Sequence, residues 1–121
     1  MKKLLLGDEA IAQGAIDAGL SGVYAYPGTP STEVTEYIQS KVVSDQQSAI
    51  RIQCRWAANE KTAMEAALGM SYMGKRALVC MKHVGMNVCA DIHDDVRGEE
   101  ARGRRDEVRA GYGGVEISKC K

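Results

Sequence analysis

Residues 56–85 read WAANEKTAMEAALGMSYMGKRALVCMKHVG, and they decide how the rest of the chain is interpreted. Asn59 is a favourable N-cap residue, and small and apolar side chains follow it at helical spacing. Glu60 falls in the first turn, where its negative charge suits the positive end of the helix dipole. Gly74 ends the predicted helix, and an apolar run then leads to the turn at residues 82–85. The stretch therefore predicts a close-packing helix, a buried strand and a polar turn, with a carboxylate at the start of the helix.

The composition limits the chain to one small domain and excludes several functional classes. The chain has 121 residues and a formal net charge of zero, so nothing in its overall charge points to nucleic acid. The core must be built from aliphatic residues, Ala and Met, because the chain has no Phe and one Trp. Its four cysteines form no C-x-x-C motif and match no zinc spacing, so we expect no metal site, and free thiols suit a cytoplasmic protein. No segment is long and apolar enough to predict a membrane span.

Upstream of residue 56 the chain alternates between predicted strands and helices. Residues 4–6 are a short apolar run that predicts a buried strand, and Asp8 is expected to cap the helix that follows. After a second strand at residues 23–26, Thr29 is expected as the next N-cap and Pro30 at the first helical position. Residues 50–56 alternate apolar and polar side chains, which predicts a half-exposed strand.

This order of elements predicts an α/β fold with a mostly parallel sheet flanked by helices, because the connections are short. In such sheets ligands bind at the carboxyl ends of the strands, where the N-termini of helices also point. Three loops are expected to converge there, at residues 26–32, 57–61 and 81–87.

The sequence changes character after Ala90. Charged residues become frequent in residues 92–121, aliphatic residues become rare, and no helical or strand period survives. We therefore expect a charged tail that is disordered or loosely packed, with a mixed-charge helix possible at residues 98–109.

Three motifs together resemble a known family. They are residues 26–32 (Tyr-Pro-Gly-Thr-Pro-Ser-Thr), 59–61 (Asn-Glu-Lys) and 81–88 (Met-Lys-His-Val-Gly-Met-Asn-Val). In this order and at this spacing, they resemble the N-terminal thiamine-diphosphate domain of the alpha subunit of indolepyruvate ferredoxin oxidoreductase. The resemblance runs from residue 3 to about residue 91. It implies that residues 1–91 form a partial pyrimidine-binding domain, and that residues 92–121 have no counterpart in the family. A truncated or frameshifted reading frame would explain the change.

The resemblance also implies an activity, cofactors and partners. The full enzyme of this family decarboxylates arylpyruvates oxidatively to an acyl-CoA, uses thiamine diphosphate with Mg, and passes electrons through 4Fe-4S clusters to ferredoxin. The implied partners are a beta subunit, a second thiamine-binding domain, ferredoxin and coenzyme A, with no nucleic acid and no membrane. The ligands for Mg and the clusters are absent from these 121 residues, so we expect the chain alone to be inactive.

Within the family, a carboxylate bonds the aminopyrimidine ring and promotes its imino form, and Glu60 matches that position. The other residues that the resemblance implies are Pro27, Gly28, Thr29, His83 and Gly85 for the cofactor, and Thr29, Lys82 and His83 for the substrate. From the residues alone, Glu60 is equally a charge that complements a helix dipole, Thr29 an N-cap, and Lys82 and His83 parts of a solvated loop.

Two further alternatives concern the function itself. The chain could be a non-catalytic fragment that only packs on a partner subunit, or it could belong to a sister enzyme that acts on pyruvate or 2-oxoglutarate. Nothing in the sequence specifies the side chain of the 2-oxo acid.

Overall fold

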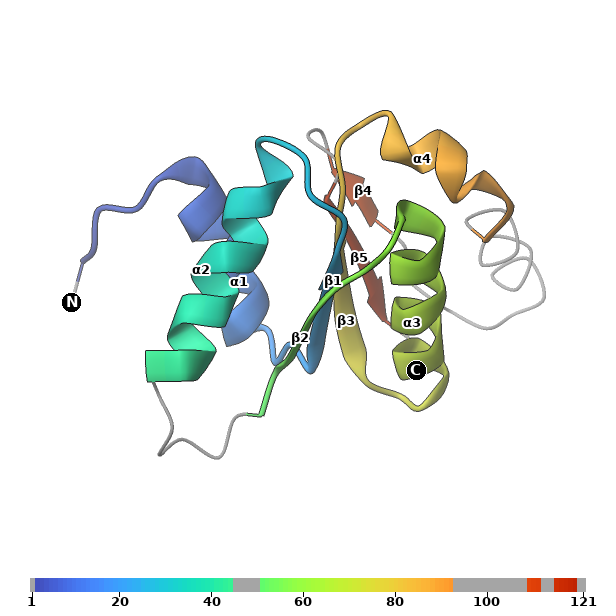
Figure 1. Cartoon of the computed structure of the whole chain (residues 1–121). Helices are drawn as coiled ribbons and strands as arrows, with labels where there is room; N and C mark the ends of the chain where they lie inside the picture. The colour runs from blue at the N-terminus through green and yellow to red at the C-terminus, as the bar shows by residue number, and fades with distance from the viewer. Residues whose placement is uncertain (1, 45–50, 93–108, 112–114, 120–121) are drawn as a thin grey trace.

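The computed structural model describes residues 2–44, 51–92, 109–111 and 115–119. These residues form an α/β fold, as predicted (Figure 1). Among them, no helix is both long and apolar enough to cross a membrane. The helices are α1 (Gly7–Asp17), α2 (Ser31–Ser44), α3 (Glu60–Tyr72) and α4 (Gly85–Val88), and the strands are β1 (Gly22–Ala25), β2 (Gln53–Trp56), β3 (Arg76–Cys80), β4 (Arg109–Gly111) and β5 (Val115–Lys119).

The strands lie in the order β2-β1-β3-β5-β4. β1 is parallel to both of its neighbours, β2 and β3. The sheet is therefore parallel, as predicted, in the three strands that precede the three motifs. Ala25 of β1 lies between Trp56 and Cys80, which places the last residues of the three strands side by side. The carboxyl ends of β1, β2 and β3 therefore form one edge of the sheet.

Helices cover both faces of the parallel strands (Figure 1). On one face α1 and α2 pack over a core that includes Val34, Ile38 and Leu78. On the other face α3 packs over a second core that includes Met64 and Val79. β3 supplies alternate residues to the two cores because successive side chains of a strand point to opposite faces. This central position explains why its run of apolar residues is nearly continuous.

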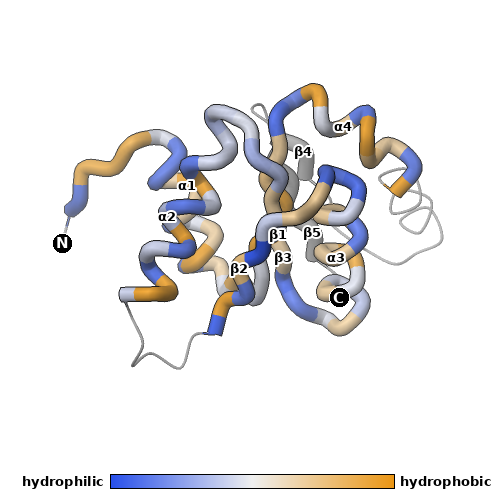
Figure 2. The backbone as a smooth tube through the Cα atoms, in the orientation of Figure 1, coloured by the Kyte–Doolittle hydropathy of each residue, from blue (hydrophilic) through white to orange (hydrophobic). Residues whose placement is uncertain are grey.

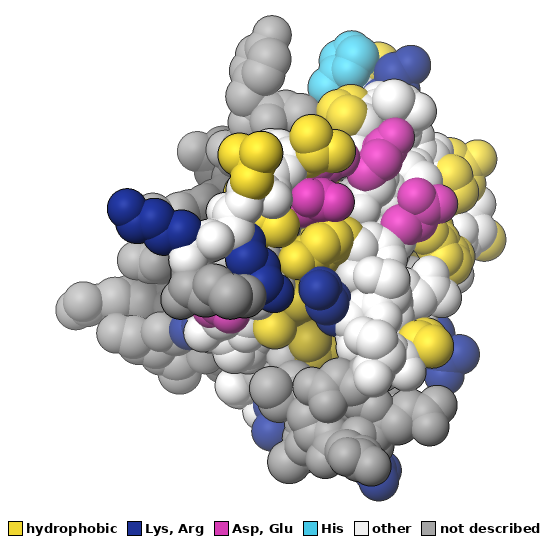
Figure 3. Space-filling view, turned by 90° about the vertical axis from the view of Figure 1, so that its left-hand side faces the viewer, with side chains coloured by type: hydrophobic (Ala, Val, Ile, Leu, Met, Phe, Trp, Pro, Cys, Tyr) yellow, Lys and Arg dark blue, Asp and Glu magenta, His cyan; other side chains and the backbone are white. Residues whose placement is uncertain are grey.

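The N-terminal apolar run does not form the strand that the sequence predicts. Residues 2–6 have no regular structure, and Leu4 and Leu6 are 101% and 69% exposed. The segment is drawn in orange where it extends away from α1 in Figure 2, and the same side of the molecule carries exposed hydrophobic side chains in Figure 3. Leu6, rather than Asp8, is the N-cap of α1, and its backbone N–H donates to the Glu9 carboxylate at 3.0 Å. Apolar composition alone does not distinguish a strand from an exposed extension when the run is this short.

The start of α2 also differs slightly from the prediction. The helix begins at Ser31, so Pro30 precedes it rather than filling its first position, and the Thr29–Pro30 peptide bond is cis. The Thr29 side chain is not the cap. Instead, the Thr32 hydroxyl accepts a hydrogen bond from the Gly28 backbone N–H at 2.8 Å, and the Ser31 hydroxyl donates to the Gly28 carbonyl at 2.6 Å. The turn is closed by these two hydroxyl groups.

The segment expected to be a loosely packed tail contributes two strands to the sheet. β5 pairs with β3 in antiparallel orientation, and β4 pairs with β5. The backbone of β3 offers a free edge for this pairing, which depends on N–H and C=O groups and needs no apolar period. Most of the rest of the segment lies outside the described residues, including all of the possible helix at residues 98–109 except Arg109, which is the first residue of β4. The division of the chain into residues 1–91 and 92–121 stays a prediction.

Candidate cofactor site at the carboxyl edge of the sheet

The loops that follow β1, β2 and β3 meet at one edge of the sheet. Backbone hydrogen bonds continue the strand pairing into these loops: the Tyr26 N–H donates to the Cys80 carbonyl at 3.2 Å, and the Ala57 N–H donates to the Ala25 carbonyl at 2.7 Å. The strand ends are thus held together up to the point where the loops begin. The predicted convergence of the three loops is therefore present in the structure.

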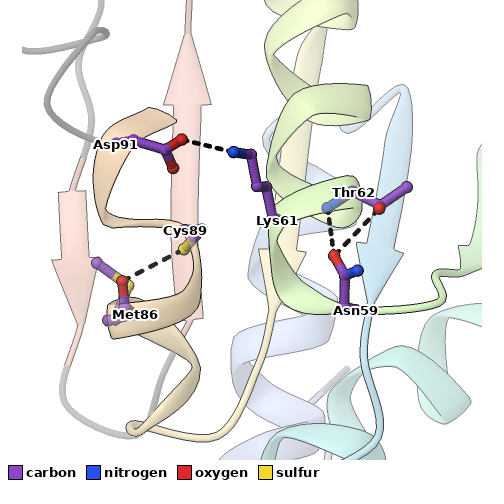
Figure 4. Close-up of polar contacts among 6 residues, drawn as sticks. All are labelled: Asn59, Lys61, Thr62, Met86, Cys89 and Asp91. Carbon is purple, nitrogen blue, oxygen red and sulfur yellow. Dashed lines mark hydrogen bonds and ion pairs between the residues drawn. The ribbon is translucent and has the colours of Figure 1, made fainter.

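Glu60 is the first residue of α3, and its place is fixed by the cap before it. The Asn59 side chain accepts a hydrogen bond from the Thr62 backbone N–H at 2.9 Å, as the sequence predicts for an N-cap (Figure 4). The Thr62 hydroxyl also donates to the same Asn59 oxygen at 3.1 Å. The cap orients the first turn of α3, so the half-buried Glu60 side chain points along the edge of the sheet towards the loop after β3.

Two close contacts join the loop after β3 to its neighbours, and both involve a glycine. A Cβ atom built on Gly85 would lie 2.6 Å from Glu60 Cγ and 3.0 Å from Glu60 Oε1. A Cβ atom built on Gly28 would lie 2.8 Å from Lys82 Cβ. Residues 82–85 therefore lie directly between the loop after β1 and the first turn of α3.

Buried sulfur-containing residues anchor this same segment at both ends. Met81 precedes it and Cys89 follows it, and both are 0% exposed. The Cys89 thiol lies 3.7 Å from Met81 Sδ and donates to the Gly85 carbonyl at 3.5 Å and to the Met86 carbonyl at 3.6 Å, the latter drawn in Figure 4. Between these anchors Lys82 is exposed, and the Gly85 N–H donates to its carbonyl at 2.8 Å. The backbone of the turn is thus tied down while the Lys82 side chain faces solvent.

An ion pair beside the site was not predicted from the sequence. Lys61 Nζ lies 2.6 Å from Asp91 Oδ2 and joins the first turn of α3 to the residues after α4 (Figure 4). The hydrogen bond from Lys61 is the main reason that the pKa of Asp91 is lowered. Both side chains are about half exposed, so the pair adds little to stability. No sequence signal links residues thirty positions apart, because only the fold brings them together.

The structure brings some of the predicted site residues together and leaves others apart. Glu60 contacts Gly85, and Gly28 contacts Lys82. Pro27, Thr29 and His83 are exposed, and among the described residues the side chains of Thr29 and His83 make no hydrogen bond or ion pair. Their predicted roles towards cofactor and substrate therefore stay predictions.

At the carboxyl edge of the sheet, the structure places the half-buried Glu60 carboxylate beside Gly85. Among the described residues, no group of three or more His, Cys, Asp or Glu side chains could hold a metal ion. A half-buried carboxylate at this edge can accept a hydrogen bond from a flat ring that offers an N–H donor, and Gly85 is buried against the stem of the Glu60 side chain.

Comparison with known proteins agrees with the resemblance that the three motifs carry. The chain is 49% identical over 90 residues to indolepyruvate oxidoreductase subunit IorA of Archaeoglobus fulgidus, a match that covers 74% of this chain and 14% of the relative. For the proteins of the same name from Thermococcus kodakarensis and Methanothermobacter marburgensis, the identity is 43% over 88 residues and 39% over 87 residues. These matches cover 73% and 72% of this chain, and 13% of each relative.

The chain thus spans about one seventh of the length of the curated relatives it matches. No family model and no solved structure matches it. Identity at this level, across almost three-quarters of the chain and in proteins of one name, nevertheless settles its ancestry. Over the matched residues, the chain belongs to the family of indolepyruvate oxidoreductase subunit IorA.

Proposed function

We propose that residues 1–91 supply the pyrimidine side of a thiamine-diphosphate site in an indolepyruvate ferredoxin oxidoreductase. The observation that supports this most directly is the position of Glu60, half-buried at the carboxyl edge of the parallel strands and in contact with the loop after β3. The relatives are named as indolepyruvate oxidoreductase subunits, which supports both the reaction class and the need for a partner subunit.

Glu60 is the proposed acid–base residue. When bound, thiamine diphosphate supplies a carbon nucleophile for the 2-oxo carbon of the substrate and accepts the electrons left by decarboxylation. The Glu60 carboxyl group exchanges a proton with a nitrogen atom of the aminopyrimidine ring, and partial burial keeps water from competing for that hydrogen bond. Pro27, Gly28 and Gly85 are proposed to lie against the cofactor, His83 to contact both cofactor and substrate, and Thr29 and Lys82 to meet the carboxylate of the 2-oxo acid.

The remaining parts of the active enzyme are proposed to come from elsewhere. They are a second thiamine-binding domain that holds the diphosphate with Mg, a beta subunit, and iron–sulfur clusters that pass electrons to ferredoxin while coenzyme A accepts the acyl group. The proposal assigns no described residue to the side chain of the 2-oxo acid, and a sister enzyme that acts on pyruvate or 2-oxoglutarate is the alternative. The rival proposal is that the chain is a non-catalytic fragment that only packs on a partner.

A titration separates the two proposals. Thiamine diphosphate is added to the isotopically labelled chain, and backbone amide shifts are followed by NMR. The cofactor proposal predicts saturable shifts confined to residues 26–29, 59–61 and 82–86. Binding should be largely kept in Glu60→Gln, whose amide can still bond the ring, and weakened in Glu60→Ala, which has no such group. The phosphate ester of an unrelated aromatic alcohol is the matched control ligand. An absence of saturable shifts at millimolar thiamine diphosphate would support the inert fragment instead.

A further inference from the structure

The backbone conformation at position 85 does not explain why this residue is glycine. Among the described residues, only Gly19 and Gly74 have a positive φ angle, so the backbone conformation of Gly85 is one that other residues adopt freely. It is also the first residue of a helix, where alanine is more favourable than glycine. Glycine at this position is therefore required by space and not by conformation.

The space that a larger side chain would need is occupied by Glu60. A Cβ atom at position 85 would lie 2.6 Å from Glu60 Cγ, 3.1 Å from Cδ and 3.0 Å from Oε1, and the first of these distances is shorter than real Cβ contacts. The crowded atom is in the stem of the side chain rather than at its far end, so a small movement of the carboxylate does not remove the overlap. Glu60 would have to leave this rotamer altogether.

Neither partner in this contact can easily move its backbone away. The start of α3 is held by the Asn59 cap, whose side chain accepts a hydrogen bond from the Thr62 backbone N–H. On the other side, the Gly85 carbonyl accepts from the buried thiol of Cys89. The Glu60 side chain is the softest part of the contact, so it is the part that a methyl group at position 85 would displace.

We infer that Gly85 is a positioning residue for Glu60: the bare Cα of Gly85 is the surface against which the Glu60 side chain is held at the edge of the sheet. The contact is a property of this chain alone, while its consequence for the cofactor rests on the proposed function. In this role Gly85 acts through Glu60 and need not touch the cofactor.

A double-mutant cycle tests the steric contact without any ligand. Gly85→Ala should lower the melting temperature when Glu60 is present, by about 4 °C or more. In the Glu60→Ala background, which lacks Cγ, the same substitution should leave the melting temperature unchanged or raise it, because alanine favours the helix. Gly69→Ala is the matched control: Gly69 lies in α3 with no atom within 4 Å of a built Cβ, so its effect should be the same in both backgrounds. An equal loss from Gly85→Ala in both backgrounds would overturn the inference.

Two further readouts follow Glu60 itself. In the unsubstituted chain, NMR should show a nuclear Overhauser contact between the Glu60 Hγ and Gly85 Hα protons, and its absence would also overturn the inference. Gly85→Ala should raise the dissociation constant of thiamine diphosphate about tenfold, the effect of losing one charge-assisted hydrogen bond. In the Glu60→Ala background the same substitution should change it less than twofold. If the unsubstituted chain does not respond to thiamine diphosphate, the proposed function fails while the thermal cycle still decides the role of Gly85.

Discussion

At the scale of single residues, Glu60 separates a catalytic reading of the site from a structural one. Glu60→Gln keeps the shape of the side chain and can still bond the ring, but it cannot exchange a proton with the ring nitrogen. We expect exchange of the proton on the thiazolium C2 atom of bound thiamine diphosphate to slow by about 10²- to 10⁴-fold. This is the usual range for general acid–base assistance. The measurement is made in deuterated solvent on a full-length IorA relative that carries residues 1–91 of this chain in place of its own.

The same substitution has a different effect if Glu60 only complements the helix dipole. In that case it changes stability by a few tenths of a kcal/mol, about the size of an exposed charge–dipole interaction, and leaves exchange of the C2 proton unaltered. Recording the melting temperature beside the exchange rate distinguishes the two cases. Unaltered exchange in the Gln variant removes Glu60 from the mechanism.

Cys80 gives a pH-dependent prediction at the same scale. Burial raises the pKa of this thiol from 9.0 to about 11, and the neighbouring Thr35 hydroxyl acts weakly in the opposite direction, although it makes no well-formed hydrogen bond among the described residues. The pKa is higher in the folded chain, so the stabilising effect of the neutral thiol is complete below pH 9 and is lost as the pH rises from about 9 to about 11. Cys80→Val has no thiol to ionise at this position. Over that pH range, its free energy of unfolding should fall by about 2–3 kcal/mol less than that of the unsubstituted chain. Urea denaturation at pH 8, 9.5 and 11 measures the difference, and parallel curves for the two proteins would contradict it.

At the scale of elements, one glycine inside α1 and another just after its end should respond to alanine with opposite sign. Gly14 lies inside the helix with no atom within 4 Å of a built Cβ, so alanine should stabilise the chain by about 0.5–1 kcal/mol. Gly19 follows the helix with a φ of +83° and equally open surroundings, so alanine there should cost about 1 kcal/mol or more from backbone strain alone. Chemical denaturation of the two variants measures both effects. Similar signs would show that the end of α1 is not held in the left-handed conformation.

Elements with a local signal were predictable from the sequence, and contacts between elements were not. The Asn59 cap of α3 and the glycine that follows this helix, Gly74 with a φ of +73°, follow from residues next to each other in the chain. The exposure of Leu4 depends on what the rest of the fold leaves uncovered, and composition cannot show that. For the site, the sequence predicted which loops converge. The contact between Gly85 and Glu60 depends on side-chain packing across twenty-five positions, so only the structure reveals it.

At the scale of the whole molecule, we expect these 121 residues to have no oxidoreductase activity alone. The chain spans 14% of the length of the Archaeoglobus fulgidus relative, and it has no cluster-type cysteine motif. Purified chain with thiamine diphosphate, Mg, coenzyme A and indolepyruvate should therefore reduce a viologen dye no faster than a blank without protein. Substrate-dependent reduction that disappears in Glu60→Gln would contradict this expectation.

The residues that line the two cores lead to a further prediction, which concerns a chain that lacks residues 93–121. The described residues that line these cores fall between Ala12 and Ile92, so we expect α1, α2 and α3 to stay packed on the parallel strands when residues 93–121 are removed. A chain that ends at Ile92 should therefore keep a cooperative thermal transition, followed by circular dichroism. It should lose the backbone pairing that β5 gives to β3, which leaves the inner strand with an open edge.

An open edge of apolar β3 residues offers unpaired N–H and C=O groups to another copy of the chain, and such edges promote association. The shortened chain should consequently form dimers or larger species at concentrations where the full chain does not, as measured by light scattering after size-exclusion chromatography. Substitutions within β3 are unsuitable as controls, because Leu78 and Val79 are buried and a change at either would disturb the core. The control is therefore the full chain at equal concentration. A shortened chain that remains monomeric would show that β5 does not protect this edge, and one that fails to fold would show that residues 93–121 belong to the core.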